Sequence, residues 1–181
     1  MSPLTRFPAR GYVDRMRRLL MIVLPLLLLS AVADAKDFTV TADYFSCIAN
    51  WAKVRNTRIF HPKKKLLKKA IRVFEKDKPH RHYPVGTVLQ LIPFEAMVKH
   101  KKRYFPETDG WEFFALGVSR AGTVIRSQGG DAINFVNLSC KNCHVAGQGF
   151  DWVCEKDHGC APIPVTDELI ATLQANDPRC Q

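Results

Sequence analysis

Hydrophobic residues recur at helical spacing within residues 42–79 and in a partly alternating, strand-like pattern beyond Tyr83. In residues 42–55 apolar side chains recur at helical spacing, so that one helical face would carry Phe45, Ile48, Ala49, Trp51 and Ala52. Residues 61–79 repeat the pattern, with an apolar stripe on one side and lysines mostly on the other. Pro62 lies near the expected start of this second helix and Pro79 lies beyond its end. The pattern therefore predicts two N-terminal helices.

Beyond Tyr83 the segments become shorter, richer in β-branched and aromatic residues, and partly alternating. Strands are expected within residues 86–93, 95–105, 111–119 and 123–127. Residues 106–110, Pro-Glu-Thr-Asp-Gly, have the composition of a turn between two of these strands. Strands that follow one another in a run indicate an antiparallel sheet and an α+β fold.

Residues 1–35 have the pattern of a signal peptide. Arg15, Arg17 and Arg18 precede an apolar run at residues 19–29, and Ala33-Asp34-Ala35 would permit cleavage before Lys36. Met16 is an alternative start. The run is shorter than the roughly 20 residues that span a bilayer, so we favour cleavage over a retained anchor. One domain is then expected at 36–181, with a helical part at 36–80 and a sheet part at 81–181, in the periplasm.

Cleavage would leave a basic domain. Residues 36–181 contain 22 Lys and Arg against 15 Asp and Glu, a net charge of +7, whereas the full chain carries +10. A basic amphipathic helix can bind anionic lipid or nucleic acid. We favour a core-packing helix with a solvated lysine face, because nucleic acid is not the usual partner of an exported protein. No nucleic-acid partner is expected, but an acidic redox partner fits the charge.

The segment Cys140-Lys141-Asn142-Cys143-His144 is the strongest chemical signal. Three interpretations are open: half of a zinc site completed from Cys154, His158 and Cys160, a redox dithiol, or a covalent c-type haem site. In the haem interpretation Cys140 and Cys143 bind the two vinyl groups, and His144 is the proximal ligand of the iron. No methionine follows Cys140, so the His/Met ligation of small electron carriers is not indicated.

Four segments in order resemble the cytochrome P-460 and cytochrome c′-beta family. They are 86–88 (Gly-Thr-Val), 95–99 (Glu-Ala-Met-Val-Lys), 111–114 (Trp-Glu-Phe-Phe), and the motif at 140–144 with 151–153 (Asp-Trp-Val). The resemblance spans about residues 83–154. It implies a five-stranded antiparallel sheet, one covalent haem c with His144 on the iron, a distal side open to small nitrogen species such as NO, and often a homodimer.

The same resemblance argues against a cross-linked haem. Members with the P-460 chromophore carry a lysine late in the Gly-Thr-Val strand, and this chain has Leu91 at that register position. The resemblance therefore favours the c′-beta-like branch, without hydroxylamine oxidation. A slipped register would make Lys99 the cross-linking residue. Apolar candidates for the distal side are Leu91, Phe94 and Phe113, and rival sixth ligands are Met97, Lys99, His100 and His158.

Four cysteines remain once the haem has taken two. Three pairings are possible for Cys47, Cys154, Cys160 and Cys180. In an oxidising compartment we expect Cys154–Cys160 and Cys47–Cys180 rather than free buried thiols or a metal site at Asp157, His158 and Cys160.

Three functions compete. The first is an exported mono-haem cytochrome that binds small ligands such as NO at an open distal site. The second is an electron-transfer module that docks an acidic partner. The third is an oxidoreductase acting on hydroxylamine or peroxide, for which the sequence shows no base–nucleophile pair.

Overall fold

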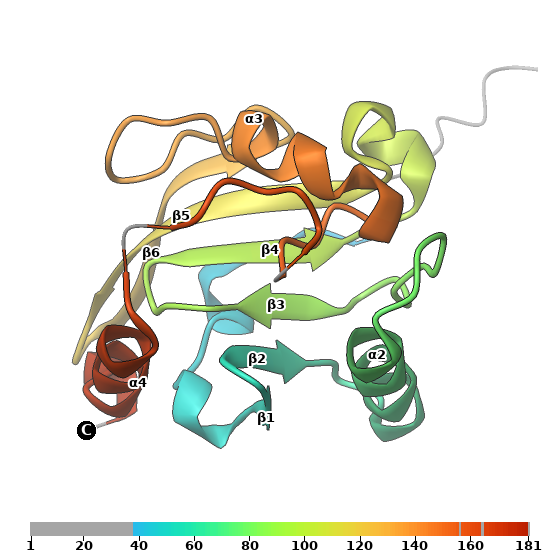
Figure 1. Ribbon diagram of the computed structural model, residues 1–181. Helices are drawn as coiled ribbons and strands as arrows, with labels where there is room; N and C mark the ends of the chain where they lie inside the picture. The colour runs from blue at the N-terminus through green and yellow to red at the C-terminus, as the bar shows by residue number, and fades with distance from the viewer. Residues whose placement is uncertain (1–37, 156, 164, 181) are drawn as a thin grey trace, which may run out of the picture. The chain divides into compact units, whose positions relative to one another are not determined.

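One antiparallel sheet of six strands organises the protein, and its strands neighbour one another in chain order (Figure 1). The strands are β1 (Ala52–Val54), β2 (Thr57–Phe60), β3 (Val88–Gln90), β4 (Glu95–Lys99), β5 (Trp111–Ser119) and β6 (Gly122–Gly129). The structure is a computed structural model that describes residues 38–155, 157–163 and 165–180. The expected signal peptide, its alternative start at Met16 and its cleavage site lie outside the described residues.

The α+β prediction is confirmed, but the strand count and the first helix are not. The run of strands after Tyr83 appears as β3 to β6, so the sheet part is as expected. Residues 42–55 form no α-helix. They contain two 3₁₀ turns, Ala42–Tyr44 and Ile48–Asn50, followed by β1. The part at 36–80 is therefore not purely helical, and the β1–β2 hairpin makes six strands instead of five.

The spacing of three explains why this segment imitates a helix. Phe45, Ile48 and Trp51 are three residues apart, a spacing that one face of a helix also shows over a short distance. All three are buried in one apolar cluster, whereas Ala49, which the prediction placed on the same face, is exposed, so the predicted face is only partly present. The hairpin that follows turns at Arg55, which has a positive φ of 51°. No Gly or Pro marks that turn in the sequence.

The second predicted helix is confirmed as α2 (Lys64–Lys76). Ala70 and Phe74 are buried against the sheet, and Leu67, Ile71 and Val73 pack beside them. Asp77 ends the helix in a left-handed conformation. The lysines at 64, 65, 68 and 69 are exposed, as expected for a core-packing helix with a solvated face.

The sheet separates two apolar clusters because alternate side chains of a strand point to opposite faces. On β4 and β5, Met97 and Phe113 belong to one cluster, whereas Val98 and Phe114 belong to the other. The first cluster also contains α2, Trp152 and Val153, and Cys140 packs against it. The segment Cys140–His144 therefore lies on the α2 side of the sheet.

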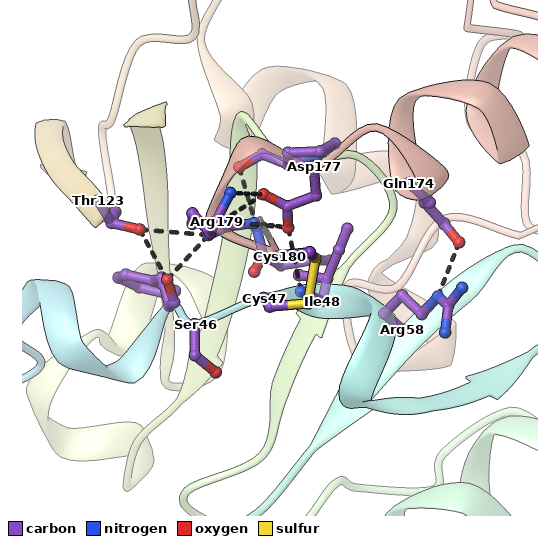
Figure 2. A network of polar contacts seen from close by, with 12 residues as sticks. Ser46, Cys47, Ile48, Arg58, Thr123, Gln174, Asp177, Arg179 and Cys180 are labelled. Atoms are coloured by element: carbon purple, nitrogen blue, oxygen red, sulfur yellow. Dashed lines mark hydrogen bonds and ion pairs between the residues drawn. A yellow bond between two sulfur atoms is a disulfide. The ribbon is translucent and has the colours of Figure 1, made fainter. Parts of the chain in front are cut away.

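Hydrogen bonds, an ion pair and a disulfide connect residues 177–180 to residues 45–48 (Figure 2). It follows α4 (Asp167–Ala175), a helix that the sequence analysis did not predict. The buried carboxylate of Asp177 accepts hydrogen bonds from the Ile48 N–H (3.0 Å) and from Arg179 Nε (2.8 Å). Arg179 also donates to the Phe45 carbonyl (2.9 Å). We call Phe45, Cys47, Ile48, Thr123, Asp177, Arg179 and Cys180 the C-terminal network.

Among the residues that the structure describes, none of the helices combines the length and the apolar character needed to cross a bilayer.

Candidate haem-binding site

The motif forms a single helical turn, α3 (Cys140–His144). Ser139 caps it, since its hydroxyl accepts a hydrogen bond from the Asn142 N–H (3.3 Å). One turn of helix brings residues three and four positions apart onto the same side. The thiols of Cys140 and Cys143 and the imidazole of His144 are therefore presented from one short, capped element.

The cysteines divide into two pairs and two free thiols. Cys47–Cys180 and Cys154–Cys160 are disulfides, which confirms both expected pairings. Cys140 and Cys143 are free. Because Cys154 and Cys160 are bonded to each other, they are not available to complete a zinc site with the motif. The described residues also contain no group of three or more His, Cys, Asp or Glu side chains placed to hold a metal ion.

The environment of Cys140 does not favour a redox dithiol. Burial, with a smaller effect from the Glu95 carboxylate, raises the pKa of the Cys140 thiol to about 11. Dithiol redox sites need the opposite shift, because the thiolate is the nucleophile.

The hydrogen bond made by His144 assigns its tautomer. Its Nδ1 lies 2.8 Å from the carbonyl oxygen of Trp152. A carbonyl can only accept, so Nδ1 carries the proton and Nε2 presents a lone pair. Burial lowers the pKa of His144, which further favours the neutral ring. A neutral imidazole whose other nitrogen donates to a carbonyl is the form that binds iron.

The turn that supplies this carbonyl is held from several sides. Asp151 is buried, and its carboxylate contacts Lys99 Nζ (2.6 Å) and accepts from the Tyr83 N–H (2.9 Å). The Trp152 indole N–H donates to Asp109 (3.3 Å). Burial lowers the pKa of Lys99, although Asp151 opposes the shift. The sequence analysis noted residues 151–153 only as part of a resemblance and did not foresee their contact with His144.

Exposed apolar side chains are concentrated in the sequence beside the motif. Nine large hydrophobic residues are exposed in the described chain, and five of them lie within 13 positions of sequence: Ile133, Phe135, Val136, Leu138 and Val145. Phe135 is 65% exposed. Asn134 closes this loop, because its side chain accepts from the Val136 and Leu138 N–H groups. Such a concentration of exposed apolar side chains is uncommon on a protein surface.

The other predicted site residues differ in their contacts and in their burial. Phe94 packs edge-on against Phe135, with ring centroids 6.1 Å apart. The Phe113 ring lies 5.0 Å from the ring of His144. Met97 is buried in the apolar cluster that Cys140 contacts. Leu91 is half-buried, and its carbonyl accepts a hydrogen bond from Gln174 (2.7 Å). Their assignment to the distal side stays a prediction.

Three of the rival sixth ligands are engaged elsewhere. Lys99 pairs with Asp151. His158 contacts Asp77 through Nε2 (2.5 Å) and the Val153 carbonyl through Nδ1 (2.6 Å). His100 is buried beside Glu112, with Nε2 2.9 Å from a carboxylate oxygen. Each would have to give up a partner before it could bind iron.

The structure adds one acidic residue that the sequence analysis had noted only as part of a motif. Glu95, on β4, is half-buried near Cys140, and burial raises the pKa of its carboxyl, against a hydrogen bond with Asn134 that lowers it. A pattern-based signal existed, since a glutamate directly precedes the apolar residues Ala96, Met97 and Val98 of this strand.

This chain is matched by no protein-family model, curated protein or solved structure. The fold and the site support an α+β protein in which two free cysteines and a histidine share one short helix. Its relation to the cytochrome P-460 and c′-beta family remains a hypothesis that rests on the motifs of the sequence.

Proposed function

We propose that this protein is an exported mono-haem c-type cytochrome that binds small ligands such as NO. Cys140 and Cys143 would hold the haem through thioethers, and His144 Nε2 would bind its iron. When bound, the haem supplies an iron centre that can take up NO or CO. The observation that carries the proposal is the selective pairing of cysteines, since four form disulfides and only the two of the C-x-x-C-H motif are free.

The residues around the motif suit this cofactor. The carbonyl of Trp152 keeps His144 in the tautomer with Nε2 unprotonated. The exposed apolar side chains at 133–145 offer a surface for the macrocycle. Apolar cover near the iron disfavours water, whereas NO and CO need no hydrogen bonds to bind. Two disulfides are in keeping with an oxidising compartment, for which we propose the periplasm.

The contacts of Lys99 support a haem without a lysine cross-link. Its ammonium group is bonded to Asp151 (2.6 Å) and to the Asp109 carbonyl (2.8 Å). Leu91, at the register position of the cross-linking lysine, has no nucleophilic atom. Both points favour ligand binding over hydroxylamine oxidation.

Electron transfer is a second candidate, and the exposed lysines of α2 favour it. Such a face would attract an acidic partner at a rate that falls with ionic strength.

Covalent attachment is tested by producing the protein together with cytochrome c maturation machinery. The denatured protein should keep its colour and give a c-type pyridine haemochrome. The Cys140→Ala, Cys143→Ala double variant should lose both. The matched control is Cys154→Ala, Cys160→Ala, which removes two cysteines nearby and should keep the haem. A colourless wild-type protein that carries stoichiometric zinc would refute the proposal.

Ligand binding is tested on the haem protein by absorption spectra with and without NO and CO. We expect five-coordinate ferrous iron, NO binding and no turnover of hydroxylamine. Peptide mapping should find haem only on the peptide that contains Cys140 and Cys143. A haem peptide that is also joined to the Lys99 region would restore the enzymatic alternative.

A further inference from the structure

The turn at Asp151 and Trp152 has an unusual backbone. Both residues have positive φ, 56° and 65°, although neither is glycine. A non-glycine residue in this region is strained and persists only where the surroundings enforce it. Two such residues in succession, directly beside the contact with His144, indicate that the conformation serves the site.

The surroundings enforce the turn at both residues. The Trp152 N–H donates to the Gly147 carbonyl (3.0 Å), and the indole N–H donates to Asp109 (3.3 Å). The Asp151 carboxylate is completely buried and is neutralised by Lys99, which is itself only 6% exposed. These contacts come from the segment after α3, from the end of β4 and from the turn before β5. The carbonyl of Trp152 is thereby held toward His144 from three parts of the chain.

We propose that Trp152, with Asp151 and Asp109 behind it, is a positioning residue that sets the tautomer and the ring plane of His144. The experiment on the haem-loaded protein rests on the proposed function, whereas the experiment on the haem-free chain does not. The acceptor is a neutral carbonyl and not the nearby carboxylate, which Lys99 occupies. A carbonyl orients the imidazole without drawing its proton away, so His144 would be an ordinary neutral ligand with little imidazolate character.

The first test uses the haem-free Cys140→Ala, Cys143→Ala chain and ¹⁵N NMR of the imidazole of His144. This parent should show one tautomer, with Nδ1 protonated and Nε2 bare. Trp152→Phe keeps an aromatic ring but removes the indole donor, and should give a mixture of tautomers. Asp109→Gly removes the acceptor at a position whose φ of 52° suits glycine, and should do the same.

The chain offers a close control for this substitution. Trp51 is 6% exposed and Trp152 is 3% exposed, and the Trp51 indole also donates one hydrogen bond of 3.3 Å, to Ser46. Trp51 belongs to the cluster on the opposite face of the sheet. Trp51→Phe should leave the signals of His144 unchanged. If Trp152→Phe and Asp109→Gly also keep a single Nδ1–H tautomer, or if Trp51→Phe disturbs it equally, the proposal is wrong.

The second test uses the haem-loaded protein. Trp152→Phe should shift and broaden the Fe–His stretching band of the ferrous protein in resonance Raman spectra and change the reduction potential, whereas Trp51→Phe should do neither. If Trp152 has only a structural role, Trp152→Phe and Trp51→Phe should both lower the melting temperature, and neither should move the Fe–His stretching band. If no haem is attached at all, the proposed function fails, and the NMR result on the haem-free chain still decides the positioning role.

Discussion

The C-terminal network and the segment at 133–153 differ in how far their cysteines are paired and their side chains are buried. In the network, the buried carboxylate of Asp177 forms an ion pair with the buried guanidinium of Arg179, and Cys47 is bonded to Cys180 (Figure 2). In the segment at 133–153, two cysteines are free and five large apolar side chains are exposed. The ion pair and the disulfide of the network are formed within the chain, whereas the segment at 133–153 keeps two free thiols and exposed apolar side chains. This difference is consistent with the proposal that the segment at 133–153 holds the haem.

The largest effect is expected from the long disulfide. Cys47 and Cys180 are 133 residues apart, and closing a loop of that length stabilises by about 5 kcal/mol in the chain-entropy model. The Cys47→Ala, Cys180→Ala variant should lose most of this free energy of unfolding in urea denaturation. The expectation fails if the loss does not exceed that of the Cys154→Ala, Cys160→Ala variant.

Breaking the ion pair of the network should come next. Arg179→Met leaves the Asp177 carboxylate buried without a cation, which costs about 3–5 kcal/mol at neutral pH. Burial by itself raises the pKa of Asp177, but hydrogen bonds from Arg179 and Ile48 outweigh it and lower the pKa. The wild-type pair therefore stabilises above the ordinary aspartate range and loses this contribution as the pH falls through the lowered pKa.

Urea denaturation of Arg179→Met at several pH values checks this dependence. The difference from wild type should be largest near neutrality and should shrink on acidification. A difference that is constant with pH would mean that packing of the arginine stem, and not its charge, is what stabilises the fold.

The short disulfide should matter less. Cys154 and Cys160 are six residues apart, and the same chain-entropy model assigns a loop of this size about 2 kcal/mol. Thermal melts of the Cys154→Ala, Cys160→Ala variant should show this smaller loss while haem attachment persists. Loss of the haem in this variant would show that the small loop helps to build the site.

The smallest effect on the haem-free chain is expected from Phe135. Because this side chain is 65% exposed, Phe135→Ala should change the free energy of unfolding by no more than about 0.5 kcal/mol. In the haem-loaded protein the same variant should lower the melting temperature, since the macrocycle would lose an apolar contact. Ile163→Ala, at a similarly exposed position, is the control and should have no effect in either form.

The sequence predicted the parts of the fold whose signals are local. The stripe of α2 and the strands after Tyr83 are set by their own periodicity, and both are present. Residues 42–55 were misassigned because apolar residues spaced three apart resemble a helical face over a short distance. What decides their structure is non-local: the disulfide from Cys47 and the hydrogen bond from Ile48 to Asp177 reach 133 and 129 residues along the chain.

The candidate site divides in the same way. Cys140, Cys143 and His144 are recognisable because their spacing is itself the signal. The Trp152 carbonyl is not recognisable, because any residue has a carbonyl and only the left-handed turn directs this one at His144. The Lys99–Asp151 pair joins positions 52 apart, and no local pattern relates them.

The long disulfide also constrains the order of events as the chain is made. The chain emerges N-terminus first, so Cys47 is present long before its partner Cys180. The first thiols to reach it are those of Cys140 and Cys143, which stay unpaired in the finished structure. Oxidation in order of appearance would therefore trap the wrong partners. Early capping of these two thiols, as thioethers would do, would prevent this mispairing, as would oxidation only after folding has brought Cys47 and Cys180 together, whereas an isomerase could exchange mispaired bonds afterwards.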